Sequence, residues 1–532
     1  MVLGDLKNNG HFFNCPSGFF YFDKEERRAF PLRDDIGFAA VINKRYGINP
    51  KEYGFKRVLA DLQSEASTNG ATTEIRRLAH YDRRTNCLYV SQFNGSMCKL
   101  DGKSVTEVDN GTDNVFFFDD VRAWEPYEYL PRALRGELDR QLIESVNFEN
   151  STLSVTEQRL FLKLWLMGVF FGNIQPTKII LLLLGEQGSG KTSALRRIQK
   201  FIFGSKVNLL SIEKEKPDGF VATITSDPIA LFDNLDERIS WLPFNLSRLA
   251  TGVTFPRRQL YTTNEKVEFP GVSWLGITAR SVDFMQSQPD LPDRTLVLKV
   301  DRLVDKKPED ELLCDVEVHR NAMWSELLDE LNRIVHYLGQ NRQSESVQFR
   351  MADFASLALK IATVWGRRPE VEGAFKKLEQ AQAELVLEGD PISLMLKIWL
   401  ADAANHGRNV SAGVLFSELG TVAKQNNSQW PFANAKMLAH RLRQLQTALK
   451  EQFKVEVSED SHAKQNLYRF WPKGVGGVPE MATATSTVDR PEGVDASSST
   501  CEPSSEPADP EQPSSDCQPS EQGPELEVLK TA

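Results

Sequence analysis

Four short runs of consecutive apolar residues alternate with segments of helical periodicity in the middle of the chain. The runs are 179–184, 229–232, 272–278 and 295–300. Near-continuous apolar strands are typical of a parallel sheet that helices cover on both faces. The pattern therefore predicts an α/β core over residues 177–305.

The segments before this core have a different pattern. Short apolar stretches at 19–22, 87–90 and 115–118 are separated by turn signals at Asn94-Gly95 and at 109–111. Small sheets with a helix or two between them explain such alternation, which predicts an N-terminal α+β domain over residues 1–122. Helical stretches at 127–148 and 157–171 predict a helical linker domain over 123–176.

Beyond the core, helical periodicity dominates, with predicted helices at 316–338, 351–365, 370–388 and 391–405. The first three form a predicted helical region over 306–389. The next unit, 390–473, has cap signals at Ser411 and Asn434, which predict helices that end near residues 424 and 450. The apolar positions of the second helix are Leu438, Leu442, Leu445 and Leu449. A predicted strand pair, 453–457 and 467–470, follows, and helices followed by a hairpin indicate a winged helix.

The last segment, 474–532, is rich in Ser, Pro, Glu and Thr and has too few apolar residues to form a core, which predicts disorder. It contains twelve acidic and two basic residues, so it accounts for the whole net charge of −10. The rest of the chain is close to neutral, and local basic patches on it can meet phosphates. The tail is either a partner-binding or DNA-mimicking segment or a solubilising end.

Composition indicates a soluble protein of the cytoplasm. The six cysteines lack the paired CxxC spacing of a zinc site and are too sparse for a disulfide framework. The N-terminus has no signal-peptide pattern, and no apolar run approaches the length of a membrane span.

The chemistry-bearing motif is GEQGSGKT, residues 185–192, which matches the pattern GxxxxGK[ST] between an apolar strand and a helix. In this motif, glycines let backbone N–H groups surround a phosphate, the lysine reaches the β- and γ-phosphates, and the Ser/Thr hydroxyl binds Mg²⁺. The sequence therefore predicts a P-loop NTPase core that binds ATP and Mg²⁺. The predicted ATP-binding residues are Gly185, Glu186, Gln187, Gly188, Ser189, Gly190, Lys191, Thr192 and Ser193.

A carboxylate at the end of a neighbouring strand is the second part of such a site. Asp233 follows the apolar run 229–232, and we expect it to hold Mg²⁺ together with Thr192. The next residue is Asn234, where many ATPases have a glutamate that activates water. Asp236 or Glu237 can reach the attacking water, although acidic residues at a solvent-facing helix start have the same pattern.

Further along, Thr278 ends the third predicted strand, where a polar side chain can sense a γ-phosphate. Two arginines follow, Arg280 and Arg294. Because an arginine at the γ-phosphate accelerates hydrolysis strongly, Arg294 is a catalytic candidate together with Lys191, Asp233 and Asp236. A structural salt bridge is the alternative for either arginine.

Between the second and third strands, two short strands are predicted at 258–262 and 267–269, joined by a polar turn at 263–266. In a ring, this hairpin would point into the central channel. Lys266, Arg257 and Arg258 could then bind a DNA backbone, or they could be ordinary surface charges.

With these motifs in order, the chain resembles the ATPases of phage- and poxvirus-type primase-helicases over about residues 10–473. This group is related to superfamily 3 helicases within the AAA+ class, and stand-alone versions are found on bacterial prophages and integrative elements. The resemblance implies a homo-oligomer, typically a hexameric ring, that moves on DNA using ATP. It also implies that the hairpin touches DNA and that an arginine acts across the subunit interface. No primase motif lies upstream, so primer synthesis is not implied.

The second helix of the winged-helix unit has a basic side formed by Lys436, His440 and Arg443, and Lys464 lies in the loop of the hairpin. These four residues are candidates for DNA contact, because in a winged helix the second helix enters the major groove and the wing meets the backbone. A solvated basic face or a protein-binding module is the alternative.

The leading hypothesis is an ATP-dependent DNA helicase or translocase-like enzyme of a mobile element. An ATP-dependent signalling or assembly switch that does not move on DNA is the main alternative. A protein that binds ATP without hydrolysing it is the third, because of Asn234.

Overall fold

The computed structural model describes most of the chain before the acidic tail. The described residues are 2–33, 36–120, 123–235, 238–258, 266–285, 287–288, 290–304, 307–343, 345–387, 390–460 and 465–472. The predicted disordered tail, Asp236, Glu237 and Lys464 lie outside them, and the side chains of residues 256–270 are not described. The predicted domain boundaries stay predictions.

A four-stranded parallel sheet forms the centre of the fold, as the apolar runs predicted. Its strands are β11 (Ile180–Leu184), β12 (Ile229–Phe232), β15 (Trp274–Ala279) and β16 (Thr295–Lys299). The order across the sheet is β12-β15-β11-β16, and each neighbouring pair is parallel. All residues of β11, β12 and β15 are buried, which is why these strands are apolar throughout rather than alternating.

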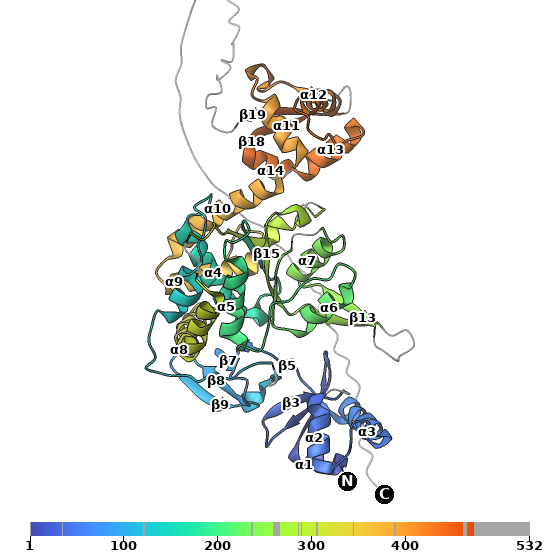
Figure 1. Cartoon of the computed structure of the whole chain (residues 1–532), viewed down its shortest axis with the longest axis vertical. Helices are drawn as coiled ribbons and strands as arrows, with labels where there is room; N and C mark the ends of the chain where they lie inside the picture. The colour runs from blue at the N-terminus through green and yellow to red at the C-terminus, as the bar shows by residue number, and fades with distance from the viewer. Residues whose placement is uncertain are drawn as a thin grey trace, which may run out of the picture. The chain divides into compact units, whose positions relative to one another are not determined.

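Helices follow or precede each of these strands (Figure 1). They are α4 (Val155–Val169), α5 (Lys191–Phe203), α6 (Pro217–Ser226) and α7 (Leu242–Ala250), with short turns η3 (Gly172–Ile174), η4 (Asp283–Met285) and η5 (Pro292–Arg294). The helix predicted at 157–171 is α4. It begins two residues earlier because Ser154 and Glu157 form a reciprocal capping box, in which each side chain accepts from the other residue's backbone N–H.

The predicted hairpin is present, and its first strand begins earlier than predicted. It consists of β13 (Thr254–Arg258) and β14 (Lys266–Pro270), which pair antiparallel, and Figure 1 shows it leaving the body of the sheet beside α6. The first strand was predicted at 258–262; it begins four residues earlier, at Thr254, and residues 259–262 lie outside the described residues. Pro256 argues against a strand at residues 254–257, but a proline is tolerated in a two-stranded ribbon with open edges.

The helix predicted at 127–148 is wrong. Most of this segment is irregular, and its helical part is a single π-helical turn, η2 (Asp139–Glu144). Pro126, Pro131 and Gly136 interrupt the helical periodicity, and Gly136 has a φ of +88°. The irregular backbone bonds to α8 (Glu309–Gln340) instead: Gly136 N–H donates to the carboxylate of Glu326 at 2.9 Å.

The N-terminal part contains the small sheets that the alternating pattern predicted. Its first elements are α1 (Val2–Asn9), β1 (Gly10–Cys15), β2 (Gly18–Asp23), β3 (Arg28–Pro31), α2 (Ile36–Tyr46), α3 (Tyr53–Asn69) and β4 (Ala71–Thr72). Strands β3-β2-β1-β4 form one sheet, and aromatic side chains such as Tyr21, Phe38 and Phe55 fill the core between it and the helices.

A second set of strands follows in the N-terminal part. It consists of β5 (Ile75–Arg76), β6 (Ala79–Asp82), β7 (Cys87–Ser91), β8 (Ser96–Leu100), β9 (Val105–Asp109), the turn η1 (Thr112–Asn114) and β10 (Phe116–Phe117). Strands β6 to β9 form an antiparallel meander. The predicted Asn94-Gly95 turn joins β7 to β8, where Gly95 has a φ of +91°.

Four helices follow the parallel sheet. They are α8, α9 (Ala352–Val364), α10 (Arg368–Leu387) and α11 (Pro391–Trp399), with the turn η6 (Ala403–Asn405) after them. Helix α8 starts seven residues before its prediction, with Glu309, Asp310 and Glu311 in a first turn where acidic residues favour the helix. Helix α11 ends before its prediction of 405.

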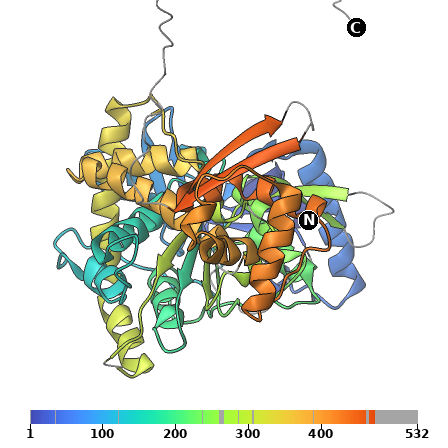
Figure 2. The same cartoon turned by 90° about the horizontal axis from the view of Figure 1, so that it is seen from above.

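Residues 410–472 combine helices with a three-stranded antiparallel sheet (Figure 2). The elements are β17 (Val410–Ser411), α12 (Ala412–Gln425), α13 (Ala435–Gln444), α14 (Gln446–Gln452), β18 (Phe453–Asp460) and β19 (Gln465–Pro472). The caps at Ser411 and Asn434 and the strand pair are confirmed. The single helix predicted to residue 450 is divided at Leu445, whose backbone leaves helical geometry so that α14 packs against α10.

Among the described residues, no helix combines the length and the apolar character that crossing a membrane requires.

Candidate functional site

The glycine-rich loop connects β11 to α5, and its glycines are required by close contacts. A Cβ on Gly185 would lie 2.1 Å from the carbonyl oxygen of Val300, and one on Gly190 would lie 2.9 Å from Leu303. Gly188 and Gly190 have φ values of +82° and +85°. The loop can therefore turn tightly against β16 and the segment after it, with its backbone facing the open side.

Lys191 begins α5 and is largely buried against this loop. Its ammonium group donates to the carbonyl oxygens of Gly185 at 2.6 Å and Glu186 at 2.7 Å, and to the hydroxyl of Ser189 at 3.1 Å. The positive charge is thus held inside the curve of the loop.

Three polar side chains meet where β12 and β15 end. The hydroxyls of Thr192 and Thr278 both donate to Oδ1 of Asp233, at 2.8 Å and 2.6 Å. The backbone N–H of Asn234 donates to the Thr278 hydroxyl at 2.8 Å, and Asn234 has a φ of +57°. Asparagine tolerates this left-handed conformation better than most residues.

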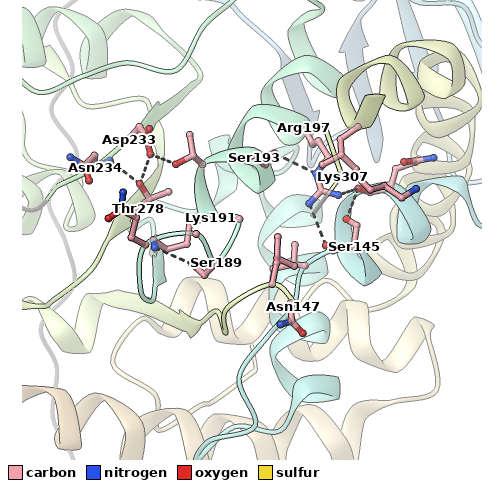
Figure 3. Close-up of a pocket in the computed structure, with 18 of the residues that line it drawn as sticks. Ser145, Asn147, Ser189, Lys191, Ser193, Arg197, Asp233, Asn234, Thr278 and Lys307 are labelled. Atoms are coloured by element: carbon pink, nitrogen blue, oxygen red, sulfur yellow. Dashed lines mark hydrogen bonds between the residues drawn. The ribbon is translucent and has the colours of Figure 1, made fainter. Parts of the chain in front are cut away.

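These groups line one wall of a cavity of about 910 Å³, within the range typical of sites for small organic ligands. Figure 3 shows Lys191, Asp233, Asn234 and Thr278 on one side and Ser145, Arg197 and Lys307 on the other. The remaining lining includes Arg140, Gln141, Ser145, Val146, Asn147, Arg197, Leu303, Lys307, Leu312 and Asp315.

Arg197 supports the opposite wall from within α5. Its guanidinium donates to the carbonyl oxygens of Ser193 at 3.3 Å, Gln141 at 3.1 Å and Ser145 at 3.4 Å. Burial lowers the pKa of Arg197 to about 10, because removing the guanidinium from water disfavours its charged form. The side-chain amide of Asn147 extends the wall by donating to the carbonyl oxygens of Asp301 and Arg302.

Sequence reasoning missed this opposite wall entirely. Apart from Arg197 of α5, its residues come from η2 and the segment after it, about forty residues before the loop, and from the segment after β16 and the first turns of α8. They form no motif, and the prediction of a continuous helix at 127–148 concealed the irregular backbone that contributes them.

Most of the predicted loop residues face the cavity. Gln187, Gly188, Ser189, Gly190, Lys191, Thr192 and Ser193 line it, whereas Gly185 and Glu186 contribute the carbonyl groups that hold Lys191. Asp233 lies with Thr192, as expected for a shared metal site. Asp236 lies outside the described residues.

The two candidate arginines have different surroundings. Arg280 lines the cavity, although the sequence favoured Arg294. Arg294 is not among the residues that line the cavity. Its guanidinium lies 2.8 Å from the carboxylate of Asp290, which also lies 3.9 Å from Arg350. Within this chain Arg294 therefore has the salt bridge that was its alternative interpretation.

The candidate DNA contacts lie in two other places. Lys266, Arg257 and Arg258 are on the hairpin strands β13 and β14, where the structure describes the backbone only. Lys436, His440 and Arg443 are all exposed on α13, and Lys464 is outside the described residues. The neighbouring Arg441 points elsewhere and forms an ion pair of 2.9 Å with the buried Asp390.

The donor set at the strand ends fits Mg²⁺. This cation is commonly bound through one or two carboxylates together with substrate phosphates, and it prefers oxygen ligands. Asp233 and Thr192 supply one carboxylate and one hydroxyl within hydrogen-bond distance of each other. Among the described residues, no group of three or more His, Cys, Asp or Glu side chains could hold a metal ion without a substrate.

One known protein family matches a part of the chain that includes this cavity. Residues 140–371 match the family described as actinomycete integrative conjugative element replication protein. The match covers the cavity. Every residue that lines it falls between positions 140 and 371. No curated protein matches the chain.

Several solved structures match the chain at low sequence identity. The SCCmec type IV Cch active helicase is 11% identical with a TM-score of 0.42, over 85% of this chain and 90% of that chain. The apo C-terminal region of NrS-1 is 11% identical with a TM-score of 0.41, over 88% and 97%. The Aeropyrum pernix Orc1 protein in complex with DNA is 14% identical with a TM-score of 0.17, over 63% and 92%.

Proposed function

We propose that this protein binds and hydrolyses ATP with Mg²⁺ and uses the energy to move on or unwind DNA during replication of a mobile element. The observation that carries the proposal is the convergence of the glycine-rich loop, Lys191 and the Thr192–Asp233–Thr278 cluster on one cavity. The match to replication proteins of integrative conjugative elements, which spans this cavity, supports the DNA part.

In this proposal the central sheet is a P-loop NTPase core of the AAA+ type. Backbone N–H groups of residues 186–191 bind the phosphates, and Lys191 exchanges its bonds to backbone carbonyls for bonds to phosphate oxygens. Thr192 and Asp233 would hold Mg²⁺, which neutralises charge on the β- and γ-phosphates when it is bound. Thr278 senses the γ-phosphate through its bond to Asp233. Asp236 orients the attacking water.

DNA is bound in two places. The hairpin residues Lys266, Arg257 and Arg258 contact the backbone, and residues 390–473 act as a winged helix that contacts duplex DNA through Lys436, His440, Arg443 and Lys464. We propose a homo-oligomer in the form of a hexameric ring, in which Arg294 exchanges its partner Asp290 for the phosphates of the neighbouring subunit.

The decisive test is DNA-stimulated ATP hydrolysis by the full chain and by its Lys191→Ala variant. We expect hydrolysis that DNA accelerates and that Lys191→Ala abolishes, because the ammonium group has no substitute at that point. Lys206→Ala is the matched control, since Lys206 is exposed after α5 and does not line the cavity.

The other outcomes separate the alternatives. Hydrolysis at equal rates with and without single- or double-stranded DNA overturns the motor and supports a signalling or assembly switch. ATP binding without turnover, lost in Lys191→Ala, supports a protein that only holds ATP, as Asn234 in place of a glutamate suggests.

A further inference from the structure

Arg280 lies directly beside the glycine-rich loop because of the register of the central strands. Ala279 pairs with Leu184, and its carbonyl oxygen accepts from the N–H of Gly185 at 3.2 Å. The residue after Ala279 is therefore next to the first residue of the loop. Arg280 is exposed to solvent and lines the cavity.

Arg280 lies one residue beyond the end of β15, two residues after Thr278. Thr278 bonds to Asp233 and accepts from the N–H of Asn234, and all three line the same cavity as Arg280. Arg280 thus belongs to the wall where the terminal phosphate would meet the metal-side carboxylate.

The other basic side chains that line the cavity have different positions or partners. Arg197 donates to three backbone carbonyls of the opposite wall, and Arg140 on that wall is paired with Glu137. Lys307 lies 3.6 Å from Glu311 at the start of α8. Lys191 donates to the carbonyl oxygen of Gly185 within the glycine-rich loop. Besides Lys191, Arg280 is a basic residue next to the strand ends that carry Asp233, Asn234 and Thr278, and it lines the same cavity.

Because Asn234 stands where many ATPases have a glutamate, a positive charge near the γ-phosphate becomes more important for the rate of hydrolysis. An amide cannot take a proton from water as a glutamate does, so less of the rate enhancement can come from base catalysis at that residue. Some nucleotide hydrolases place an arginine in the same chain as the phosphate loop, where it stabilises charge on the transferring phosphoryl group. The position of Arg280 suits this role.

We propose that Arg280 is a catalytic residue that contacts the γ-phosphate bound in its own subunit, an inference that rests on the proposed ATPase function. As the bond from the water oxygen to the γ-phosphorus forms, the bond to the β–γ bridging oxygen breaks and its electron pair stays on ADP. Both protons of the water leave with inorganic phosphate as H₂PO₄⁻. The guanidinium of Arg280 stabilises the charge on the γ-phosphoryl oxygens and on the bridging oxygen.

The first experiment measures ATP turnover together with ATP and ADP affinity for wild type, Arg280→Ala, Arg280→Lys and the control Arg302→Ala. Arg302 is exposed close to the cavity but does not line it. We expect Arg280→Ala to lower kcat by about 10³-fold, the lower end of arginine contributions to phosphoryl transfer. ATP affinity should fall while ADP affinity stays unchanged, and Arg280→Lys should recover only part of the rate because it lacks the planar fork.

A merely structural role predicts equal losses of ATP and ADP affinity, and this result would overturn the proposal. Turnover by Arg280→Ala at the wild-type rate would do the same. If wild type itself binds but does not hydrolyse ATP, the proposed ATPase function fails first, and equal ATP affinity of wild type and Arg280→Ala then refutes the γ-phosphate contact separately.

The second experiment asks whether Arg280 acts within its own subunit. Arg280→Ala is mixed with Lys191→Ala, so that each variant supplies the group that the other lacks. An arginine that acts in its own subunit leaves the mixture inactive, as we expect. Recovery of turnover on mixing would show that Arg280 serves a neighbouring subunit and would overturn the assignment.

Discussion

Polar side chains at the ends of β12 and β15 bond to one another, whereas those on helix α13 are exposed to solvent. At the strand ends, Thr192, Asp233 and Thr278 bond to one another, and Thr278 is 1% exposed. On α13, Lys436 and Arg443 are exposed, and the fold of the helix depends on the buried face of leucines behind them. The bonded cluster fixes the positions of its side chains, whereas α13 exposes positive charges to solvent.

This difference has consequences for what a substitution can do. A side chain within a bonded cluster positions its neighbours, so its removal should affect structure and chemistry together. An exposed charge can be removed with little effect on stability, so its removal should affect only the partner that it meets. Substitutions in the two regions can test whether the structural contrast is also a functional one.

Between the strand ends and α13, the larger effect is expected at Asp233. Asp233→Asn keeps an oxygen that can accept from both threonines but removes the charge that would bind Mg²⁺. We expect kcat to fall by about 10²- to 10³-fold, with the unfolding temperature unchanged and a higher Mg²⁺ concentration needed for half-maximal turnover. Turnover assays across a Mg²⁺ titration and thermal unfolding measure the three quantities.

Asp233→Ala sharpens the same point, because it also leaves the buried Thr278 hydroxyl without this acceptor. Its free energy of unfolding should fall by about 1–3 kcal/mol, whereas that of Asp233→Asn should not. Equal stability of the two variants would mean that the bonded cluster contributes nothing to the fold.

On α13, the double variant Lys436→Ala/Arg443→Ala should weaken DNA binding and leave DNA-independent ATP turnover unchanged. If both cations neutralise phosphates, the slope of log affinity against log salt concentration should become shallower by about two. Fluorescence anisotropy with labelled duplex DNA at several salt concentrations measures this slope.

Arg408→Ala is the matched control in the same unit, since Arg408 pairs with Glu418 and does not belong to α13. An unchanged slope in the double variant, or an equal change in Arg408→Ala, would mean that the basic side of α13 is only solvated.

The two regions were also predictable to different degrees. The strands and the loop followed from local pattern, because a buried parallel strand must be apolar throughout and the loop needs glycine at Gly188 and Gly190. The caps at Ser411 and Asn434 were likewise local signals. Such features depend on a few neighbouring residues, so they can be predicted from a single sequence.

What the sequence did not reveal depends on contacts between distant residues. The irregular segment before η2 is held by α8, about 190 positions away, through bonds such as Gly136 to Glu326. The choice between Arg280 and Arg294 depended on strand register and on the ion pair with Asp290. The break at Leu445 depends on packing of α14 against α10. None of these partners is visible from spacing along the chain.

The smallest predicted effect compares helix caps in the two regions. The side chain of Asn434 accepts from the N–H of Met437 at 3.0 Å at the start of α13, and Ser154 accepts from the N–H of Glu157 at 3.3 Å at the start of α4. Loss of either cap should cost about 1 kcal/mol. Hydrogen exchange should become faster in the first turn of α13 in Asn434→Ala and in the first turn of α4 in Ser154→Ala.

The two caps should nevertheless differ in function. Asn434→Ala should weaken DNA binding slightly, because the start of the basic helix frays, and should leave ATP turnover unchanged. Ser154→Ala should leave DNA binding unchanged, since α4 packs against the buried central sheet and carries none of the proposed DNA contacts. Asn434→Ala could instead alter ATP turnover in the absence of DNA as much as it alters DNA binding. Helix α13 and the cavity would then be coupled, and the bonded cluster and the exposed cations of α13 would not have separate functions.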